Sequence, residues 1–251
     1  MAALRLAVLS DVHGNLAALE AALADIMRHK PERIVVTGDL VFNGPRPGET
    51  LDRLRALEGD GAIVVAGNTD VAVADADYAA AFPWMESVPA AQRAAAEWAH
   101  DQLSDEQLEY LRRLPAERRL WTDSIFVLAT HASPGSMTAG LATDLDPTVT
   151  VERVTRTDAR VICCGHTHVA DVRELGRKLI VNPGSCGYAF DDDPAACWAL
   201  LTVPDGEDAE PTAELFRPAY DAAAAAEEVA QRGLAGDVYR AATIRTGRLI
   251  R

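Results

Sequence analysis

The sequence contains no apolar stretch close to the roughly 20 residues that a membrane-spanning helix needs. Its first apolar run, MAALRLAVL, is short and is soon followed by Asp11 and His13, so we expect neither a membrane span nor a secretory signal. Basic residues are also scarce, since 24 Lys and Arg stand against 38 Asp and Glu and give a formal net charge of −14. This balance excludes an extended nucleic-acid surface and argues against an anionic membrane as a partner. A small anionic substrate stays compatible with it, because bound divalent metals can reverse the local potential.

Cysteine is rare as well. The four cysteines show no C-x-x-C spacing, and they are Cys163, Cys164, Cys186 and Cys197. We therefore expect small buried thiols in a reducing cytoplasm rather than a disulfide framework or a thiolate metal site. The 251 residues are 49% hydrophobic, which predicts a packed globular chain, and we expect a single domain over residues 1–251.

Apolar runs and amphipathic segments alternate in the first part of the chain. Short apolar runs predict strands at residues 4–9, 33–37 and 62–66. Apolar residues spaced three and four apart predict helices at residues 15–29 and 48–58. Strands that alternate with helices in this way are typical of a layered α/β fold.

The pattern changes after the third strand. Residues 71–118 lack strand-like runs and predict a helical insertion, in which Ser104 and Gln107 have the spacing of a capping box. Strands are predicted again at 124–129 and 161–164, with a short helix at 149–156, and then in KLIVNPGS, CWALLTV and AELFRPAY. Because no helices separate these last runs, we expect antiparallel or mixed pairing. An alanine-rich helix opens a C-terminal helical tail at about 220–251.

Polar side chains follow five of the predicted strands, at the point where each strand ends. Their types, carboxylate, imidazole and amide, are those that bind metal ions, and they are Asp11, His13, Asp39, Asn68, His131, His166 and His168. In an α/β sheet the carboxyl ends of parallel strands open onto one edge, where such folds place their sites. In D-x-H and H-x-H the two side chains lie two residues apart, so that on extended backbone they share a face. The sequence therefore predicts one metal-binding cleft.

The motifs D-x-H, G-D, G-N, an isolated His and G-H-x-H, in this order, resemble the calcineurin-like metallophosphoesterase superfamily, and VNPGSCGYAFDDDPAACWALL resembles its small bacterial phosphodiesterase branch. The resemblance implies a four-layer αββα sandwich of two mixed β-sheets flanked by helices. It also implies two metal ions, one held by Asp11, His13, Asp39 and His168, and one held by Asp39, Asn68, His131 and His166. Two such ions clamp a phosphate, and a hydroxide that bridges them attacks phosphorus. This mixed ligand set suits manganese first, with iron or zinc as alternatives.

One position departs from the family pattern. The residue after the G-N asparagine is a histidine in many members, where it assists the leaving group, and here it is Thr69. Threonine is too weak an acid for that role, although it can donate a hydrogen bond. General acid catalysis contributes about 10²–10⁴-fold, so substrates with good leaving groups are favoured, unless Asp70 or His100 supplies the proton. The predicted catalytic residues are Asp39, Asn68, Thr69 and Asp70, and the predicted substrate contacts are Asn15, Asn68 and Thr69.

Other polar residues near these motifs leave alternatives open. Asn15 contacts substrate phosphate or caps the helix that it precedes. Ser185 contacts phosphate or only stabilises a turn, and Arg46 contacts substrate or is solvated. The acidic run at residues 191–193 fits a solvated loop better than a third metal site.

The sequence thus predicts a cytoplasmic phosphoesterase with two metal ions that hydrolyses phosphodiester or phosphoanhydride bonds of small molecules, nucleotides among them. The alternatives are a metal-binding scaffold with residual activity and a small-molecule phosphomonoesterase. The expected partner is a small phosphorylated substrate, and the oligomeric state is left open.

Overall fold

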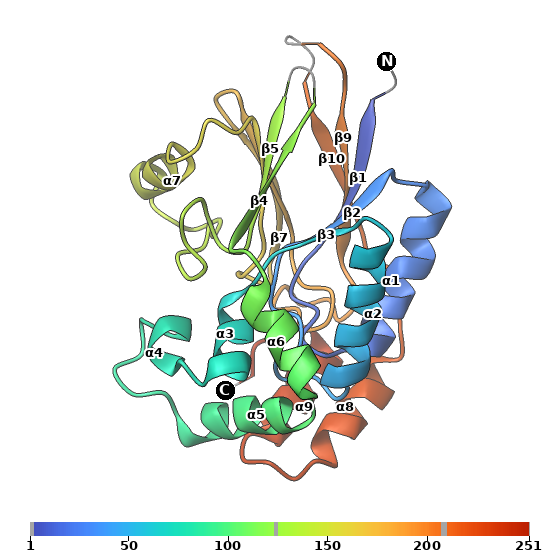
Figure 1. Cartoon of the computed structure of the whole chain (residues 1–251), viewed down its shortest axis with the longest axis vertical. Helices are drawn as coiled ribbons and strands as arrows, with labels where there is room; N and C mark the ends of the chain where they lie inside the picture. Colours follow the sequence, from blue (N-terminus) through green and yellow to red (C-terminus); the bar gives the residue numbers. More distant parts are fainter. Residues whose placement is uncertain (1–2, 123–124, 207–209, 251) are drawn as a thin grey trace.

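Two five-stranded β-sheets face each other in the computed structural model, which describes residues 3–122, 125–206 and 210–250 (Figure 1). The first sheet has the order β10 (Thr212–Phe216), β9 (Trp198–Val203), β1 (Leu4–Leu9), β2 (Arg33–Val36) and β3 (Ile63–Val64). The strands β1, β2 and β3 are parallel, whereas β9 is antiparallel to both β1 and β10.

The second sheet has the order β4 (Glu117–Trp121), β5 (Phe126–Thr130), β6 (Val161–Cys163), β8 (Lys178–Pro183) and β7 (Ala170–Leu175). Its central strands β5, β6 and β8 are parallel, and the edge strands β4 and β7 are antiparallel to their neighbours. Both sheets are therefore mixed, which confirms the pairing predicted for the later strands.

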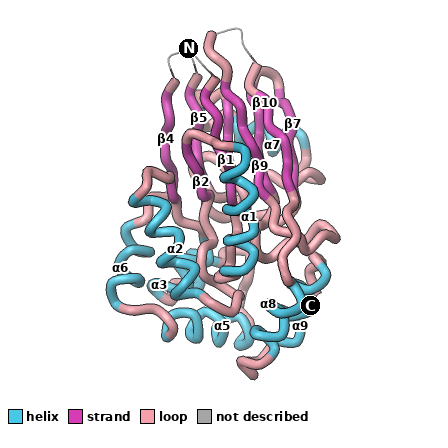
Figure 2. The backbone as a smooth tube through the Cα atoms, turned by 90° about the vertical axis from the view of Figure 1, so that its right-hand side faces the viewer, coloured by secondary structure: helices cyan, strands magenta, loops and turns pink. Residues whose placement is uncertain are grey.

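Helices cover the outer face of each sheet. The helices α1 (Leu16–His29) and α2 (Pro47–Gly59) pack on the first sheet, and α7 (Pro147–Val154) packs on the second (Figures 1 and 2). Along β1, Leu6 and Val8 face the second sheet, whereas Ala7 and Leu9 face the helices, as the twofold alternation of a strand requires. The layers run helix, sheet, sheet, helix, which confirms the predicted four-layer sandwich.

The remaining helices gather at one end of the sandwich (Figure 1). They are α3 (Asn68–Asp75), α4 (Tyr78–Ala81), α5 (Ala90–Asp101), α6 (Asp105–Arg113), α8 (Ala222–Ala230) and α9 (Asp237–Thr246). Ser104 caps α6 as predicted, because its hydroxyl accepts from Gln107 N at 3.3 Å while Gln107 Oε1 accepts from Ser104 N at 2.9 Å. Within the described ranges, no helix combines the length and apolar character that crossing a membrane requires.

The structure adds two strands that the sequence patterns do not indicate, β4 and β7. Both lie at an edge of the second sheet. The strand β4 begins at the end of the range 71–118 predicted as a helical insertion, and the helices of this region begin at Asn68 and end at Arg113. Of the strand predicted at 124–129, Ser124 lies outside the described residues, and the strand itself is β5.

Candidate metal centre

The seven predicted ligands stand in the loops that leave the strand ends. Asp11 and His13 follow β1, Asp39 follows β2, Asn68 begins α3 after β3, His131 follows β5, and His166 and His168 follow β6. Five of them have a positive φ between 51° and 68°, namely Asp11, His13, Asp39, His166 and His168. Residues with a side chain rarely adopt this left-handed conformation. Such strain clusters at functional sites, where the surrounding structure enforces it.

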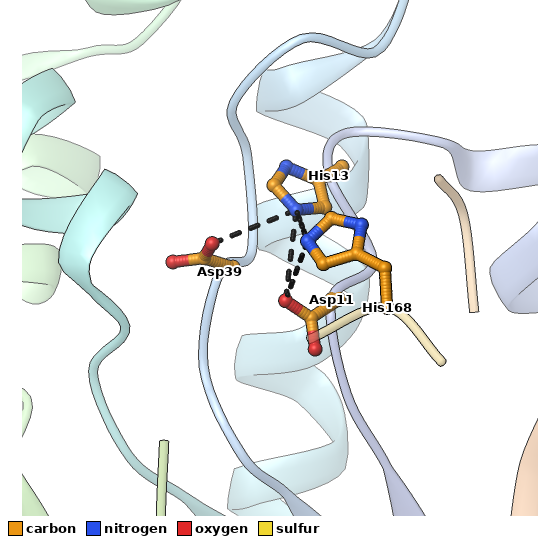
Figure 3. A group of neighbouring side chains, drawn as sticks. All are labelled: Asp11, His13, Asp39 and His168. Carbon is orange, nitrogen blue, oxygen red and sulfur yellow. Dashed lines mark hydrogen bonds and ion pairs between the residues drawn. The ribbon is translucent and has the colours of Figure 1, made fainter. Parts of the chain in front are cut away.

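Four of these side chains form a first group (Figure 3). One ligand atom each of Asp11, His13, Asp39 and His168 lies within 4.8 Å of the others. His168 Nε2 is 3.1 Å from Asp11 Oδ1 and 3.2 Å from His13 Nε2, and His13 Nε2 is 3.5 Å from Asp39 Oδ2. All four residues are buried. This is a possible metal-binding site with two oxygen and two nitrogen donors.

The other three ligands form a second group next to the first. Asn68 Oδ1 is 3.0 Å from both His131 Nε2 and His166 Nδ1, and these two nitrogens are 3.2 Å apart. Asp39 Oδ1 is 3.4 Å from His131 Nε2. Asp39 therefore turns one carboxylate oxygen toward each group. The structure brings all seven predicted side chains together.

The hydrogen bonds of the imidazoles leave lone pairs pointing into the site. The Nδ1 atoms of His13 and His131 lie 2.9 Å from Phe42 O and 2.7 Å from Thr37 O, and His168 Nδ1 contacts Tyr188 O. Because a carbonyl oxygen only accepts, each Nδ1 donates and each Nε2 of the neutral ring carries a lone pair. Backbone carbonyls often orient metal-binding histidines in this way.

The orientation of the donor atoms shows whether these residues fit a metal ion. When both rings are neutral, the Nε2 atoms of His13 and His168, 3.2 Å apart, turn lone pairs toward each other, and a metal ion or a proton between them removes the repulsion. The buried Asp11 Oδ1 beside them accepts no hydrogen bond. Its partner Oδ2 accepts from Ser10 Oγ at 2.5 Å and from His166 N at 2.9 Å. One Asp11 oxygen is thus fixed by the protein and the other is turned to the site, so the donor set fits a divalent metal.

The electrostatics of the site keep its first carboxylate ionised. In the metal-free protein, burial raises the pKa of Asp11, but the charge of a protonated His168 and the contacts with His13 and His168 outweigh it and hold the pKa well below its ordinary value. Burial lowers the pKa of His131, yet the charges of Asp39 and Asp11 raise it overall. His166 behaves differently, because burial and the neighbouring His131 lower its pKa to about 4. A neutral His166 is a competent metal ligand near neutral pH.

Thr69 and Asp70 both contact Asp39 from α3. The backbone N–H of Thr69 donates to Asp39 Oδ1 at 2.9 Å, and its buried hydroxyl has no hydrogen-bond partner. Asp70 accepts from the backbone N–H groups of Asp39, Leu40 and Gly67 at 2.8–3.0 Å. These bonds give Asp70 a positioning role for the Asp39 loop. A part for Asp70 in proton transfer stays a prediction.

The hydrogen bonds of Asn15 support its capping role rather than the predicted contact with substrate. Asn15 is fully buried, and its Oδ1 caps α1 by accepting from Ala18 N at 3.2 Å. Its amide donates to Gly187 O and to the Tyr220 hydroxyl, both at 3.0 Å. The capping alternative is therefore the one observed, because no donor of this side chain is left for a phosphate.

The other polar residues with open roles also have protein partners. Ser185 Oγ donates to Asp11 O and accepts from Tyr188 N, both at 2.7 Å, so it stabilises a turn. Arg46 forms an ion pair with Glu228, and His100 Nδ1 contacts Val73 O at 2.7 Å. In the acidic run, Asp191 pairs with Arg217 and Asp192 with Arg248, so arginines rather than a metal balance it.

Sequence reasoning missed two residues that support the ligands. Ser10 fixes the Asp11 carboxylate, and Phe190 stacks on His168 with ring centroids 4.2 Å apart and planes 14° apart. A serine directly before the first ligand was the available signal for Ser10. Phe190 had none, because its position beside His168 depends on the tertiary fold.

Comparisons with known proteins agree with this fold. The model of the calcineurin-like phosphoesterase superfamily domain matches residues 4–206. An uncharacterised protein of Methanocaldococcus jannaschii is 26% identical over 244 residues, which cover 91% of this chain and 93% of the relative. The crystal structure of a metallophosphoesterase from Sphaerobacter thermophilus has a TM-score of 0.75 and 28% identity, covering 98% of this chain and 99% of that one. A hypothetical protein of Pyrococcus horikoshii OT3 shares the fold, with a TM-score of 0.80, 22% identity and coverage of 97% and 98%.

Proposed function

Because this chain belongs to the calcineurin-like phosphoesterase superfamily and is a metal-dependent phosphoric ester hydrolase, we propose that it uses two divalent metal ions to hydrolyse phosphodiester or phosphoanhydride bonds of small molecules, including nucleotides. The observation that carries the proposal is the position of Asp39. Its Oδ2 is 3.5 Å from His13 Nε2 in the first group, and its Oδ1 is 3.4 Å from His131 Nε2 in the second. A carboxylate placed between two sets of nitrogen donors is suited to bridging two ions.

The seven ligands divide into two metal sites that share Asp39. Asp11, His13, Asp39 and His168 would hold one ion, and Asp39, Asn68, His131 and His166 would hold the other. When bound, such a pair neutralises phosphate charge and lowers the pKa of a water molecule. We propose manganese for both sites, with iron or zinc as alternatives, because imidazole, carboxylate and amide ligands without thiolate suit these metals. A cytoplasmic location for the enzyme stays a prediction.

The protein itself orients the ligands and limits the choice of leaving group. The backbone of Thr69 holds one Asp39 oxygen in place, and its unpartnered hydroxyl can donate one hydrogen bond to an oxygen of the substrate. It cannot protonate an alkoxide near neutral pH. The leaving group must then depart as a stabilised anion, as from an anhydride or an aryl-like ester. This reasoning favours diesters and anhydrides over unactivated monoesters.

The scaffold alternative is weaker, because both groups of donors are complete and their imidazoles are oriented by carbonyl hydrogen bonds. A scaffold binds its partner through the shape of its surface, and this binding does not require buried nitrogen and oxygen atoms that converge on one point. A phosphomonoesterase remains the second candidate, since the same two ions would hold a monoester.

The test compares manganese-dependent hydrolysis of an aryl phosphodiester and an aryl phosphomonoester by the wild type, Asp39→Asn and Thr69→His. We expect the wild type to prefer the diester and Asp39→Asn to lose both activities. Thr69→His should gain activity toward esters with poor leaving groups, up to about 10²-fold. Metal analysis accompanies each assay. A wild type that carries two ions and hydrolyses neither ester nor an anhydride would contradict the proposal and favour the scaffold.

A further inference from the structure

One ligand of the candidate metal centre is more exposed to solvent than the others. Of its seven side chains, six are buried, and His166 is the one that is partly exposed. The next residue, Thr167, is partly exposed too. A substrate that places its phosphate at the metal centre therefore enters past His166, and groups beside His166 are placed to contact the rest of that substrate.

Trp84 lies beside this opening. Its indole meets the His166 ring edge to face, with centroids 5.9 Å apart and planes at 73°. It comes from the turn that follows α4, and 54% of the residue is exposed. Such an exposed aromatic ring contributes less to the stability of the fold than a buried one, since much of its apolar surface stays in water.

Trp84 is also held in place. Phe82 contacts its ring at 5.8 Å and 89°, and Phe42 contacts Phe82 at 6.2 Å. The Phe42 carbonyl is the group that orients His13. A row of rings thus connects Trp84 to the first ligand group.

The faces of the Trp84 ring are not used for stacking. Both of its ring contacts are edge to face, and among the described residues no ring stacks on it. Trp121 offers a comparison, because it is even more exposed, at 71%, but stacks on Phe126 at 4.4 Å and 14°. Trp121 therefore uses one ring face for packing within the protein, whereas Trp84 is more than half exposed and stacks on no ring among the described residues.

We propose that Trp84 is a substrate-binding residue that stacks on a planar ring of the substrate, such as a nucleobase or an aryl group. The proposal rests on the proposed function and narrows it to phosphate compounds that carry such a ring. Stacking on an aromatic side chain tolerates any base, because every base has a π-face. Trp84 would therefore select for the presence of a ring rather than for one base.

The test measures by calorimetry the equilibrium binding of two compounds to the manganese-loaded protein. They are AMP and ribose 5-phosphate, which carries a hydroxyl at C1 in place of the base. We expect the wild type to bind AMP about tenfold more tightly than ribose 5-phosphate. Trp84→Ala should bind the two equally, Trp84→Phe should keep most of the difference, and the matched control Trp121→Ala should keep all of it. Metal content should be unchanged in every variant.

Three results would overturn the assignment of Trp84: equal or undetectable binding of both compounds by the wild type, an unchanged preference in Trp84→Ala, or loss of metal from Trp84→Ala, which would make the tryptophan a support of His166. The proposed hydrolase function fails separately. A wild type that prefers AMP but hydrolyses no phosphate ester or anhydride contradicts the hydrolase alone, and an active wild type without the preference contradicts Trp84 alone.

Discussion

Gly67 offers a sharp test of how accurately Asp39 must be placed. A Cβ added at Gly67 would lie 2.1 Å from Asp39 Oδ1 and 2.3 Å from Asp39 N. The φ of Gly67 is −104°, which alanine adopts freely, so Gly67→Ala perturbs the site through this contact and not through backbone strain. Ordinary contacts of a Cβ begin near 3.4 Å, and the carboxylate must therefore move by more than 1 Å.

A displacement of that size has a predictable cost. Misplacing a catalytic group by about 1 Å lowers the rate by about 10²-fold, and overpacking lowers the free energy of unfolding by about 1–3 kcal/mol. We expect Gly67→Ala to lose about 10²-fold in kcat on an aryl phosphodiester and to bind manganese more weakly. The protein should still fold, with a lower Tm by thermal denaturation.

The matched control is Gly59→Ala at the end of α2, where an added Cβ has no atom within 4 Å and φ is not positive. This variant should keep its activity and gain up to about 1 kcal/mol of stability through the lower entropy of its unfolded chain. If Gly67→Ala kept the kcat and the metal affinity of the wild type, the argument that Asp39 needs a fixed position between the two ligand groups would be refuted.

Three further predictions concern stability. In the metal-free protein, burial and the charge of Asp39 raise the pKa of Asp70 to about 7. The contribution of Asp70 to stability should therefore be complete below about pH 4 and lost as the pH rises through 7. Urea titrations should show that the free energy of unfolding of Asp70→Asn depends less on pH than that of the wild type, and an equal dependence on pH would contradict this. Asp237→Asn should lower the free energy of unfolding by about 3–5 kcal/mol, because Asp237 is buried between Arg232 at 2.7 Å and Arg240 at 3.0 Å. If Asp237→Asn lowered Tm no more than the same substitution at an exposed aspartate, this prediction would be contradicted. Chelation should lower Tm, since metal at 100 times its Kd stabilises the native state by about 2.7 kcal/mol, and an unchanged Tm would show that no metal was bound.

The central strands and the ligands were predictable because each depends on a local pattern. The strands β1, β2 and β5 are short apolar runs, and each ends one to three residues before a potential ligand. The edge strands β4 and β7 were not predictable in this way. Their sequences, ERRLW and ADVREL, carry charged residues because one side of each strand has no partner strand. Solvent at the edge removes the apolar pattern that identifies a strand.

Contacts between residues that are distant in sequence could not be predicted from local patterns either. Asn15 precedes a helix beside two predicted ligands, a position that fits both a cap and a phosphate contact. The choice depends on Tyr220 and Gly187, which are distant in sequence and take up its amide protons. The roles of Asp70 and Trp84 likewise depend on loops that only the folded chain brings together.

The backbone of the site connects its stability with its function. Among the described residues, nine non-glycine residues have a positive φ, and five of these are candidate ligands. At about 1 kcal/mol or more each, the five together cost about 5 kcal/mol, which is comparable with the lower end of the usual free energy of unfolding, about 5–15 kcal/mol. A scaffold would be more stable without this strain, whereas a bound metal ion would offset it, so the strained loops fit the proposed metal-dependent function better than a scaffold role.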